Sequence, residues 1–170
     1  MKTLVRILKI LGSVILILAV VGGGFGLYTV RRSFPQVNGE LSVHGLQAAV
    51  DVYRDSMGVP NIYADNTHDL FFAQGYVHAS ERFWQMDFWR HISAGRLSEM
   101  FGATSLDTDL FLRTLGWARV AEQEWAQSDA DSRVILQSYA DGVNAYLANH
   151  QGAALSLEYV VLGINNKNYQ

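Results

Sequence analysis

The fold is decided by residues 50–102, which read VDVYRDSMGVPNIYADNTHDLFFAQGYVHASERFWQMDFWRHISAGRLSEMFG. Apolar and polar side chains alternate over residues 46–53, and this period of two is typical of a half-buried strand. Residues 55–58 have turn chemistry, with Gly58 free to take a positive φ. Pro60 cannot donate to a ladder, so it suits the start of a second strand. The stretch therefore begins with two short predicted strands around a turn.

A long helix is predicted after the second strand. Asn66 or Thr67 can cap its first turn, and Asp69 places negative charge at the positive end of the helix dipole. Apolar side chains then recur at helical spacing on one face, and they are Phe72, Tyr76, Ala79, Phe83 and Met86. Gly75 and Gly95 interrupt the pattern at a cost of about 1 kcal/mol each relative to alanine. The close approach of another backbone would explain both glycines, as would a bend near Gly95.

The same helix carries apolar bulk on its other sides, at Phe71, Val77, Trp84, Phe88, Trp89 and Ile92. A helix that is apolar nearly all round should be buried among other elements. We expect the two helices that follow to cover only part of this apolar surface, so that residues 33–170 become ordered only with the downstream part of the protein. The side chains expected to stay uncovered are Phe72, Tyr76, Phe83, Trp84 and Met86. Asp87 can reach Arg90 or His91, and Arg96 can reach Glu99, at helical spacing. These charges are either buried pairs or the lining of a solvated groove.

These residues resemble the penicillin acylase family, whose members are N-terminal-nucleophile hydrolases. The matching words keep the family's order and spacing, and they are Arg54-Asp55, Gly58-Val59-Pro60, Ile62, Ala64, Asp69-Leu70, Ala73-Gln74-Gly75-Tyr76, His78-Ala79, Arg82, Gln85-Met86-Asp87, Arg90, Gly95-Arg96-Leu97, Glu99 and Gly102. A second match covers residues 139–146, which read YADGVNAY. The chain departs from the family pattern at Asn61, where His is common, at Ser80-Glu81, where Gln-Asp is common, and at Trp89, where a second basic residue is common.

The resemblance covers about residues 38–170 and implies an α+β fold. It implies that the chain forms the helix-rich N-terminal segment of a larger four-layer αββα hydrolase, with a short β-hairpin, a long helix and two or more further helices. In the family this segment is only the front of a precursor several times longer. We therefore expect the chain to be a fragment, with residues 46–170 as the truncated N-terminal part of a penicillin-acylase-like domain.

Two further helices are predicted after a turn at residues 103–106. Asp107 or Thr108 can cap the first, and its apolar face is Phe111, Leu115, Ala118, Val120 and Trp125. Ser128, with Asp131 three residues later, can cap the second, which runs to about Asn149. Its apolar face is Ile135, Tyr139, Val143 and Tyr146. Core packing explains both stripes better than a cofactor would.

An apolar segment precedes the body of the chain. Residues 10–30 contain no charged side chain and would span about 30 Å as a helix, the thickness of a hydrocarbon core. Three cationic side chains precede them, which favours a cytoplasmic N-terminus at residues 1–9 and a body on the extracytoplasmic (periplasmic) side. We therefore predict a single-pass transmembrane anchor at residues 10–30 and a linker at residues 31–45. A cleaved signal peptide is the alternative, although no A-x-A site follows the apolar run.

The composition excludes several classes of protein. The 170 residues are 49% hydrophobic and 12% aromatic, which is enough for one globular core and argues against disorder. With no cysteine, the chain has no disulfide, thiolate nucleophile or cysteine-ligated zinc. Residues 1–32 carry five cationic side chains and no carboxylate, which leaves a formal charge of −8 for residues 33–170. Such an acidic body offers no phosphate-binding surface, so we expect no nucleic-acid partner.

The motifs that carry hydrolytic chemistry are absent from the sequence. No G-x-S-x-G, S-x-x-K or H-E-x-x-H occurs. A structural or surface role is expected for each of the five scattered histidines, His44, His68, His78, His91 and His150. His78 and Glu81 share a helix face but supply two metal ligands at best. Arg54 and Asp55 are a candidate active pair, although a turn-fixing carboxylate is the commoner use of aspartate there.

The resemblance explains this absence. In the family, the nucleophile is a serine (threonine or cysteine in wider relatives) that becomes the N-terminus of a second chain after self-cleavage, and its own α-amine serves as the base. An asparagine side chain and a backbone amide of that second chain complete the oxyanion hole. Some members also hold calcium between the chains, through first-chain ligands expected beyond Gln170. We therefore assign no catalytic, substrate-binding or metal residue and no cofactor to this chain, and we expect the second chain of the same precursor as its partner.

Two functions from different classes fit the sequence. The first is the N-terminal fragment of a membrane-anchored amidohydrolase that cleaves acyl-amide bonds, such as those of acylated β-lactams or acyl-homoserine lactones. This fragment is expected to be inactive by itself. The second is a non-catalytic, membrane-tethered helical binding module. A serine-initiated, β-rich region downstream would establish the first function, and a genuine stop codon after Gln170 would favour the second.

Overall fold

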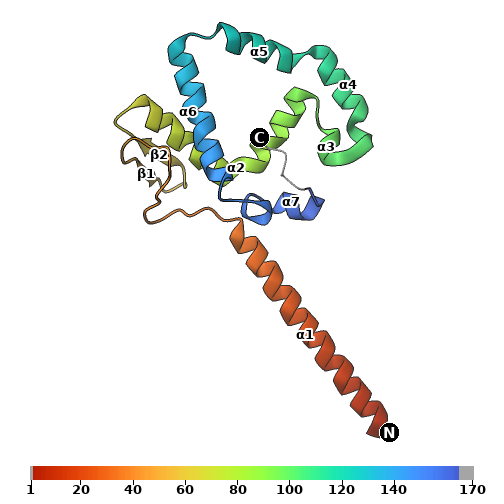
Figure 1. The fold of residues 1–170 in the computed structure, drawn as a ribbon. Coiled ribbons are helices and arrows are strands. Elements are labelled where there is room, and N and C mark those ends of the chain that lie inside the picture. The colour runs from red at the N-terminus through yellow and green to blue at the C-terminus, as the bar shows by residue number, and fades with distance from the viewer. Residues whose placement is uncertain (1, 165–170) are drawn as a thin grey trace.

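The computed structural model of the chain describes residues 2–164, so the last six residues of the predicted domain lie outside the described part. The elements follow in the order α1 (Lys2–Arg32), β1 (Asp51–Arg54), β2 (Pro60–Tyr63), α2 (Thr67–Ala94), α3 (Ser98–Phe101), η1 (Gly102–Ser105), α4 (Leu106–Leu115), α5 (Trp117–Gln127), α6 (Ala130–Leu147), η2 (Gly152–Ala154) and α7 (Leu157–Leu162). Figure 1 shows α1 as a long rod that stands away from the body. The helix-rich character and the short β-hairpin agree with the predicted segment.

β1 and β2 form an antiparallel hairpin. In its turn, the Asp55 carboxylate accepts hydrogen bonds from the amides of Met57 and Val59, both at 2.8 Å. Gly58 takes a φ of 81°, so the predicted turn is confirmed. The predicted first strand is too long, however, because β1 begins only at Asp51.

Asp69 is the reason why the residues before β1 stay out of the sheet. Its fully buried carboxylate accepts hydrogen bonds from the amides of Gln47 at 2.9 Å and Ala48 at 2.8 Å, so these donors do not enter a ladder. Of the two predicted caps, Asn66 rather than Thr67 caps the helix, and its Oδ1 accepts a hydrogen bond from the Asp69 amide at 2.7 Å. Asp69 therefore joins the segment just before β1 to the start of α2. The sequence predicted only that its charge would stabilise the helix dipole.

α2 is long but not straight. Arg82 has a non-helical φ of −138° and ψ of 24°, so the bend lies there and not near Gly95. Gly95 instead ends the helix, with a left-handed φ of 61° that favours glycine. A Cβ at Gly95 would also lie 2.9 Å from the carbonyl oxygen of Asp109 on α4. The predicted approach of another backbone at this glycine is therefore confirmed.

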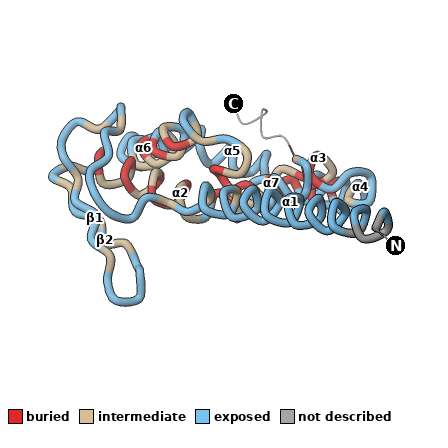
Figure 2. Tube along the Cα trace, turned by 90° about the horizontal axis from the view of Figure 1, so that it is seen from below, coloured by how far each residue is buried: buried red, intermediate tan, exposed pale blue. Residues whose placement is uncertain are grey.

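α2 and α6 pack most closely where two glycines face the opposite helix. A Cβ on Gly75 would lie 2.1 Å from the carbonyl oxygen of Tyr139, and a Cβ on Gly142 would lie 1.9 Å from that of Phe72. Only glycine allows the two backbones to come this close. The predicted backbone approach at Gly75 is thus confirmed, and Figure 2 shows buried residues gathered on these two helices.

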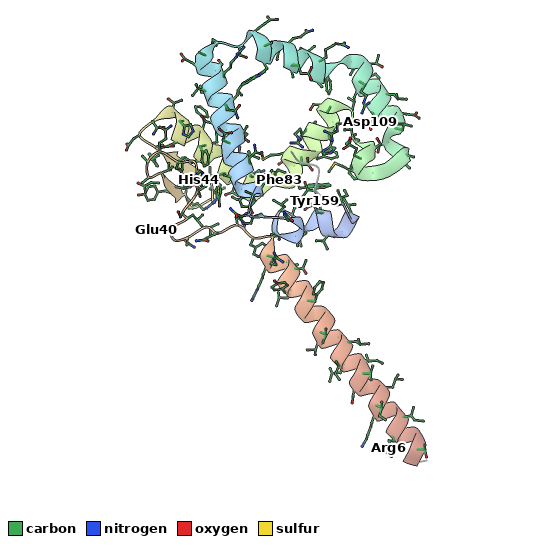
Figure 3. The ribbon with its side chains drawn as sticks, in the orientation of Figure 1. Arg6, Glu40, His44, Phe83, Asp109 and Tyr159 are labelled. Atoms are coloured by element: carbon green, nitrogen blue, oxygen red, sulfur yellow. The ribbon has the colours of Figure 1, made fainter. Side chains whose placement is uncertain are left out.

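The core lies between α2, α6 and the returning segment of η2 and α7. Its buried members are Ala79, Phe83, Tyr146, Leu155 and Tyr159. Phe72 and Phe83 are 2% and 4% exposed, so the expectation that these side chains stay uncovered within this chain is wrong at these positions. Gly45 of the linker lies against the Phe72 ring, and Phe83 is covered by Tyr146 of α6 and by Tyr159 of α7, whose ring centroid lies 6.3 Å from that of Phe83 (Figure 3).

α4 and α5 form an arch between α3 and α6 in Figure 1. The single helix predicted from Asp107 or Thr108 is wrong, because Gly116 takes a φ of 77° and divides it. Its predicted apolar face is largely exposed, with Phe111 at 62% and Trp125 at 42%. The cap of α6 is also corrected: Asp129, rather than Ser128, accepts a hydrogen bond from the Ser132 amide at 2.8 Å.

α1 exposes large apolar side chains along its length. The part of α1 at Lys9–Arg32 is long and apolar enough to cross a membrane, a criterion that a signal sequence also meets. The helix begins at Lys2, so it extends into the predicted N-terminal segment of residues 1–9. Within the body, α1 contacts η2. The transmembrane span itself stays a prediction.

Candidate functional site

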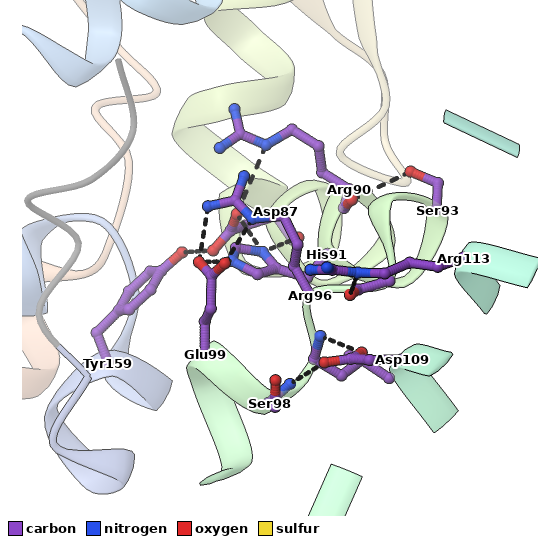
Figure 4. A network of polar contacts seen from close by, with 12 residues as sticks. Asp87, Arg90, His91, Ser93, Arg96, Ser98, Glu99, Asp109, Arg113 and Tyr159 are labelled. Carbon is purple, nitrogen blue, oxygen red and sulfur yellow. Dashed lines mark hydrogen bonds and ion pairs between the residues drawn. The ribbon is translucent and has the colours of Figure 1, made fainter. Parts of the chain in front are cut away.

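A polar junction lies at the C-terminal end of α2, and Asp87 is at its centre (Figure 4). The Asp87 side chain is buried, and its Oδ2 accepts a hydrogen bond from the Tyr159 hydroxyl at 2.6 Å. His91 Nδ1 lies 3.1 Å from Asp87 Oδ1, and Arg90 Nε lies 4.0 Å from the same atom. The hydrogen bond between Asp87 and Tyr159 thus holds α7 against α2, although the two residues are 72 positions apart in the sequence.

The environment of Asp87 affects its protonation. Burial raises the pKa of Asp87 above its usual value, although the hydrogen bond from Tyr159 and the charges of His91 and Arg90 act in the opposite direction. Burial, the hydrogen bond to Asp87 and the charge of Asp87 together raise the pKa of Tyr159 far above its usual value. Tyr159 therefore keeps its proton and acts as a hydrogen-bond donor, not as a base or nucleophile.

A second ion pair lies at the edge of the junction. Arg96 donates two hydrogen bonds to the Glu99 carboxylate, both at 2.7 Å, and Glu99 Oε2 lies 3.9 Å from His91 Nε2. The hydrogen bonds from Arg96 hold the pKa of Glu99 below its usual value. The predicted Asp87–His91 and Arg96–Glu99 pairs are confirmed. The sequence left open whether these charges are buried pairs or line a solvated groove. Asp87 is in a buried pair, whereas the Glu99 side chain is 45% exposed.

Asp109 joins α4 to the same region. Its carboxylate accepts hydrogen bonds from the amides of Leu97 at 2.7 Å and Ser98 at 2.8 Å, and so satisfies the start of α3. Arg113 Nε donates to the carbonyl oxygen of Gly95 at 2.9 Å. Burial alone would raise the pKa of Asp109, but the hydrogen bonds from Ser98 and Leu97 and the charge of Arg113 hold it below its usual value.

The histidines lie apart from one another, and of the five only His91 belongs to the polar junction. His44 is exposed in the linker, His68 lies 2.9 Å from the Asp69 carboxylate, and His78 lies 3.0 Å from the Tyr139 hydroxyl. His150 stacks on the Tyr146 ring with centroids 3.9 Å apart. Within residues 2–164, no group of three or more carboxylate or imidazole side chains could hold a metal ion.

The two candidate pairs of the sequence are separated in the structure. Glu81 forms an ion pair with Arg54 rather than a site with His78. Asp55 fixes the hairpin turn, and Arg54 reaches across to α2, so the two do not act together. The Arg54–Glu81 pair instead attaches the hairpin to the middle of α2.

Sequence reasoning missed three residues that organise this part of the molecule. Asp109 on α4 binds the start of α3, 12 residues earlier at Leu97, and Tyr159 on α7 binds α2, 72 residues earlier at Asp87. Asp69 binds the backbone before β1, 22 residues earlier at Gln47. Each was assigned to a local role or to none. Asp69 and Asp109 lie in the first turns of α2 and α4, where the helix dipole already favours a carboxylate, so the sequence carried no signal of their long-range partners.

Removing the Tyr159 hydroxyl is expected to show how much the polar junction contributes to the stability of the fold. In Tyr159→Phe, Asp87 loses its buried donor, and the free energy of unfolding at pH 7 should fall by about 2 kcal/mol, the value of a hydrogen bond to a charged group. The loss should shrink as the pH falls through the raised pKa of Asp87, because a protonated Asp87 no longer needs this donor. Urea unfolding of the complete chain in micelles measures both.

The exposed Tyr63 supplies the control for this prediction. Tyr63→Phe should leave unfolding unchanged at every pH. In the double variant Asp87→Asn/Tyr159→Phe, the pH dependence of the loss should disappear. A Tyr159→Phe loss that is the same at pH 4 and pH 7 would contradict the assignment.

Comparison with known proteins decides the family of this fold. The family model described as penicillin amidase matches residues 49–170, which include the hairpin, the α2–α6 crossing and the polar junction. The chain belongs to the penicillin amidase family. The suspected resemblance is therefore confirmed.

Curated and solved members of the penicillin amidase family show how much of it the chain covers. Penicillin acylase 2 proenzyme of Pseudomonas sp. (strain SE83) is 38% identical over 134 residues, which is 79% of this chain and 17% of that protein. Acyl-homoserine lactone acylase QuiP of Pseudomonas aeruginosa is 38% identical over 119 residues, 70% of this chain and 14% of that protein. Penicillin G acylase from Alcaligenes faecalis has a similar structure, with a TM-score of 0.62 and 32% identity over 69% of this chain and 63% of that one. The chain thus spans about one-sixth of the length of the curated relatives.

Proposed function

We propose that the chain is the N-terminal part of a membrane-anchored amidohydrolase that cleaves acyl-amide bonds outside the cytoplasm. The observation that carries this proposal is the penicillin amidase family match over residues 49–170. The structural likeness to a penicillin G acylase supports it. Because the chain spans about one-sixth of its relatives, we assign the activity to a longer protein with the four-layer αββα fold.

Within that enzyme, the described part of the chain supplies the scaffold. Asp69, Asp87 and Asp109 all accept hydrogen bonds that hold separate segments together, so none of them is available as a general base. The nucleophile in this proposal is a serine at the N-terminus of a second chain, with its own α-amine as base. An asparagine side chain and a backbone amide of that chain stabilise the oxyanion, and calcium ligands from the first chain lie beyond Gln170.

The proposed substrates follow the relatives. Two of these are named as a penicillin acylase and an acyl-homoserine lactone acylase. Both substrate classes present an acyl group on an amide nitrogen, and hydrolysis releases a carboxylic acid and an amine. We therefore propose acylated β-lactams or acyl-homoserine lactones as substrates of the longer protein.

The test of activity uses the reading frame as it continues past the codon for Gln170. The longer protein should hydrolyse a chromogenic phenylacetyl amide or an acyl-homoserine lactone, and replacing the new N-terminal serine with alanine should abolish this. Residues 1–170 alone should show no hydrolysis above the uncatalysed rate. Hydrolysis by residues 1–170 that one substitution abolishes would contradict the proposal. A stop codon directly after Gln170 would favour the non-catalytic module.

The proposed anchor has its own test. The chain should keep its N-terminus, stay in the membrane fraction after carbonate extraction, and be digested by protease added to the periplasmic side. Leu16→Arg with Leu18→Arg should release it, because each charge at a helix centre costs about 2.5–3.5 kcal/mol on insertion scales. Thr3→Arg, near the helix end, should not. A mature protein that begins near Gly24 would refute the anchor.

A further inference from the structure

A cavity of about 860 Å³ lies between the linker and the helices of the body, within the volume range of small-molecule sites. Most residues of the segment 32–54, which covers the linker and β1, line one side of it. The other side includes Tyr76 on α2 and Tyr146 on α6, whose rings meet edge to face with centroids 5.4 Å apart. The cavity therefore has an aromatic floor at the half-buried Tyr76, against which the buried Tyr146 packs.

The linker side of the cavity is mixed in polarity, and three large apolar side chains on it are open to solvent. Phe34, Val37 and Leu41 line it and are 68%, 50% and 49% exposed. These three side chains fall within eight residues of one irregular segment and gather at one cavity, unlike single apolar residues scattered over a surface. An apolar ligand would take up the surface that they expose.

The cavity begins where α1 ends. Arg32 is the last residue of α1 and also lines the cavity. α1 contacts η2, so this helix is held against the body near the cavity. If Lys9–Arg32 crosses the membrane, as proposed above, Arg32 lies at the level of the lipid head groups and the apolar lining of the cavity starts directly above them.

The charges around the cavity are unevenly placed. Glu40 and Asp51 line it, and Arg54, which also lines it, forms an ion pair with Glu81. Arg32 is exposed at the α1 end, with its guanidinium 5.7 Å from the centroid of the Tyr28 ring. An anionic group is therefore favoured at the membrane end of the cavity and repelled from the part near Glu40 and Asp51.

We propose that this cavity binds one acyl chain whose anionic head group lies at Arg32. The chain lies on the aromatic floor, and Phe34, Val37 and Leu41 cover it from the linker side. A fatty-acid carboxylate and the acyl chain of an anionic phospholipid share this chemistry. The proposal rests on the membrane anchor of the proposed function, but it does not depend on amide hydrolysis.

The experiment uses the complete chain in nanodiscs of neutral phosphatidylcholine. A fluorescent polyene fatty acid should bind saturably. Ala49→Trp, at an exposed position that lines the cavity, should weaken binding about tenfold or more, because the indole ring occupies volume that the acyl chain needs. Ala121→Trp, at an exposed position of α5, is the matched control and should not change binding. Circular dichroism should show equal helix content in all chains.

The head group is tested with the neighbouring arginines. Arg32→Gln should weaken binding of the acid about threefold, the size of an exposed charge pair, and leave binding of its methyl ester unchanged. Arg31→Gln should have no effect, because Arg31 does not line the cavity. A phosphatidylglycerol that carries the same polyene chain distinguishes the sources: tighter binding of this probe assigns the site to the bilayer, and tighter binding of the acid assigns it to free fatty acid.

Three outcomes would overturn the proposal. Equal binding by the Ala49→Trp and Ala121→Trp chains would exclude the cavity, and an equal loss in both arginine variants would exclude Arg32 as the head-group partner. A methyl ester bound as tightly as the acid would exclude an anionic head group. Failure of the longer protein to hydrolyse amides would refute the proposed function and leave these binding results unaffected.

Discussion

Replacing Gly142 with alanine is expected to lower the free energy of unfolding by about 2 kcal/mol, although alanine favours helix formation by about 1 kcal/mol. The added Cβ would lie 1.9 Å from the carbonyl oxygen of Phe72, so α6 must move away from α2. Overpacking costs about 1–3 kcal/mol in general, and the upper end applies here because a backbone cannot rotate aside. The melting temperature of the complete chain should fall by about 4–8 °C.

Asn144 supplies the control in the same helix, because its side chain is exposed. Asn144→Ala should leave the melting temperature unchanged or raise it slightly, since alanine is the better helix former. Gly75→Ala should resemble Gly142→Ala, and the double variant should lose less than the two single losses together. One displacement of α6 relieves both clashes, so the two sites are coupled. A melting temperature that rises in Gly142→Ala would show that the helices do not cross at this distance.

Replacing Asp69 with alanine is expected to have an effect of similar or larger size, about 3 kcal/mol, because it leaves two backbone donors without their charged acceptor. The donors are the amides of Gln47 and Ala48, which should exchange hydrogen faster in the variant than in the parent chain. Asp65→Ala, at an exposed position just before the helix, should change neither unfolding nor exchange. An unchanged exchange rate at residues 47 and 48 in Asp69→Ala would contradict the assignment.

The same carboxylate predicts a pH dependence. Burial alone would raise the pKa of Asp69, but hydrogen bonds from Gln47, His68, Asn66 and Ala48 hold it well below its usual value. A lowered folded-state pKa means that the stability from Asp69 is fully present above the unfolded pKa of about 3.9 and is lost as the pH falls below it. Acid unfolding of the parent chain should therefore be steeper below pH 4 than that of Asp69→Ala, as measured by circular dichroism.

The features that the sequence predicted correctly depend on neighbours close in the chain. The Asp55 turn, the Asn66 cap and the Arg96–Glu99 pair each join residues within four positions, where backbone geometry leaves few alternatives. Gly75 was informative because glycine inside a helix is unfavourable unless close packing requires it. Its partner helix could not be named from the sequence, since any later helix satisfies the same requirement.

The errors have a common physical cause. Gly116 divides the helix predicted across it, because a left-handed residue ends a helix whatever the apolar pattern on either side. Part of the cover of α2, at Phe83, comes from α7, a helix of six residues that is too short to show a period of its own. Asp87 and Tyr159 were unrelated in sequence, and only the return of α7 brings them together. Long-range partners of this kind carry no periodic signal.

The crossing of α2 and α6 also has a consequence for how the chain is made. α2 ends at Ala94 and α6 at Leu147, so the longer helix is complete well before its cover exists. At about 5–20 residues per second, the roughly fifty residues in between take about 3–10 s to synthesise. During this interval Phe83, which is buried against Tyr146 of α6 and Tyr159 of α7 in the finished structure, has neither helix to cover it. The ribosome-bound chain is therefore most exposed to aggregation while α3, α4 and α5 are being translated.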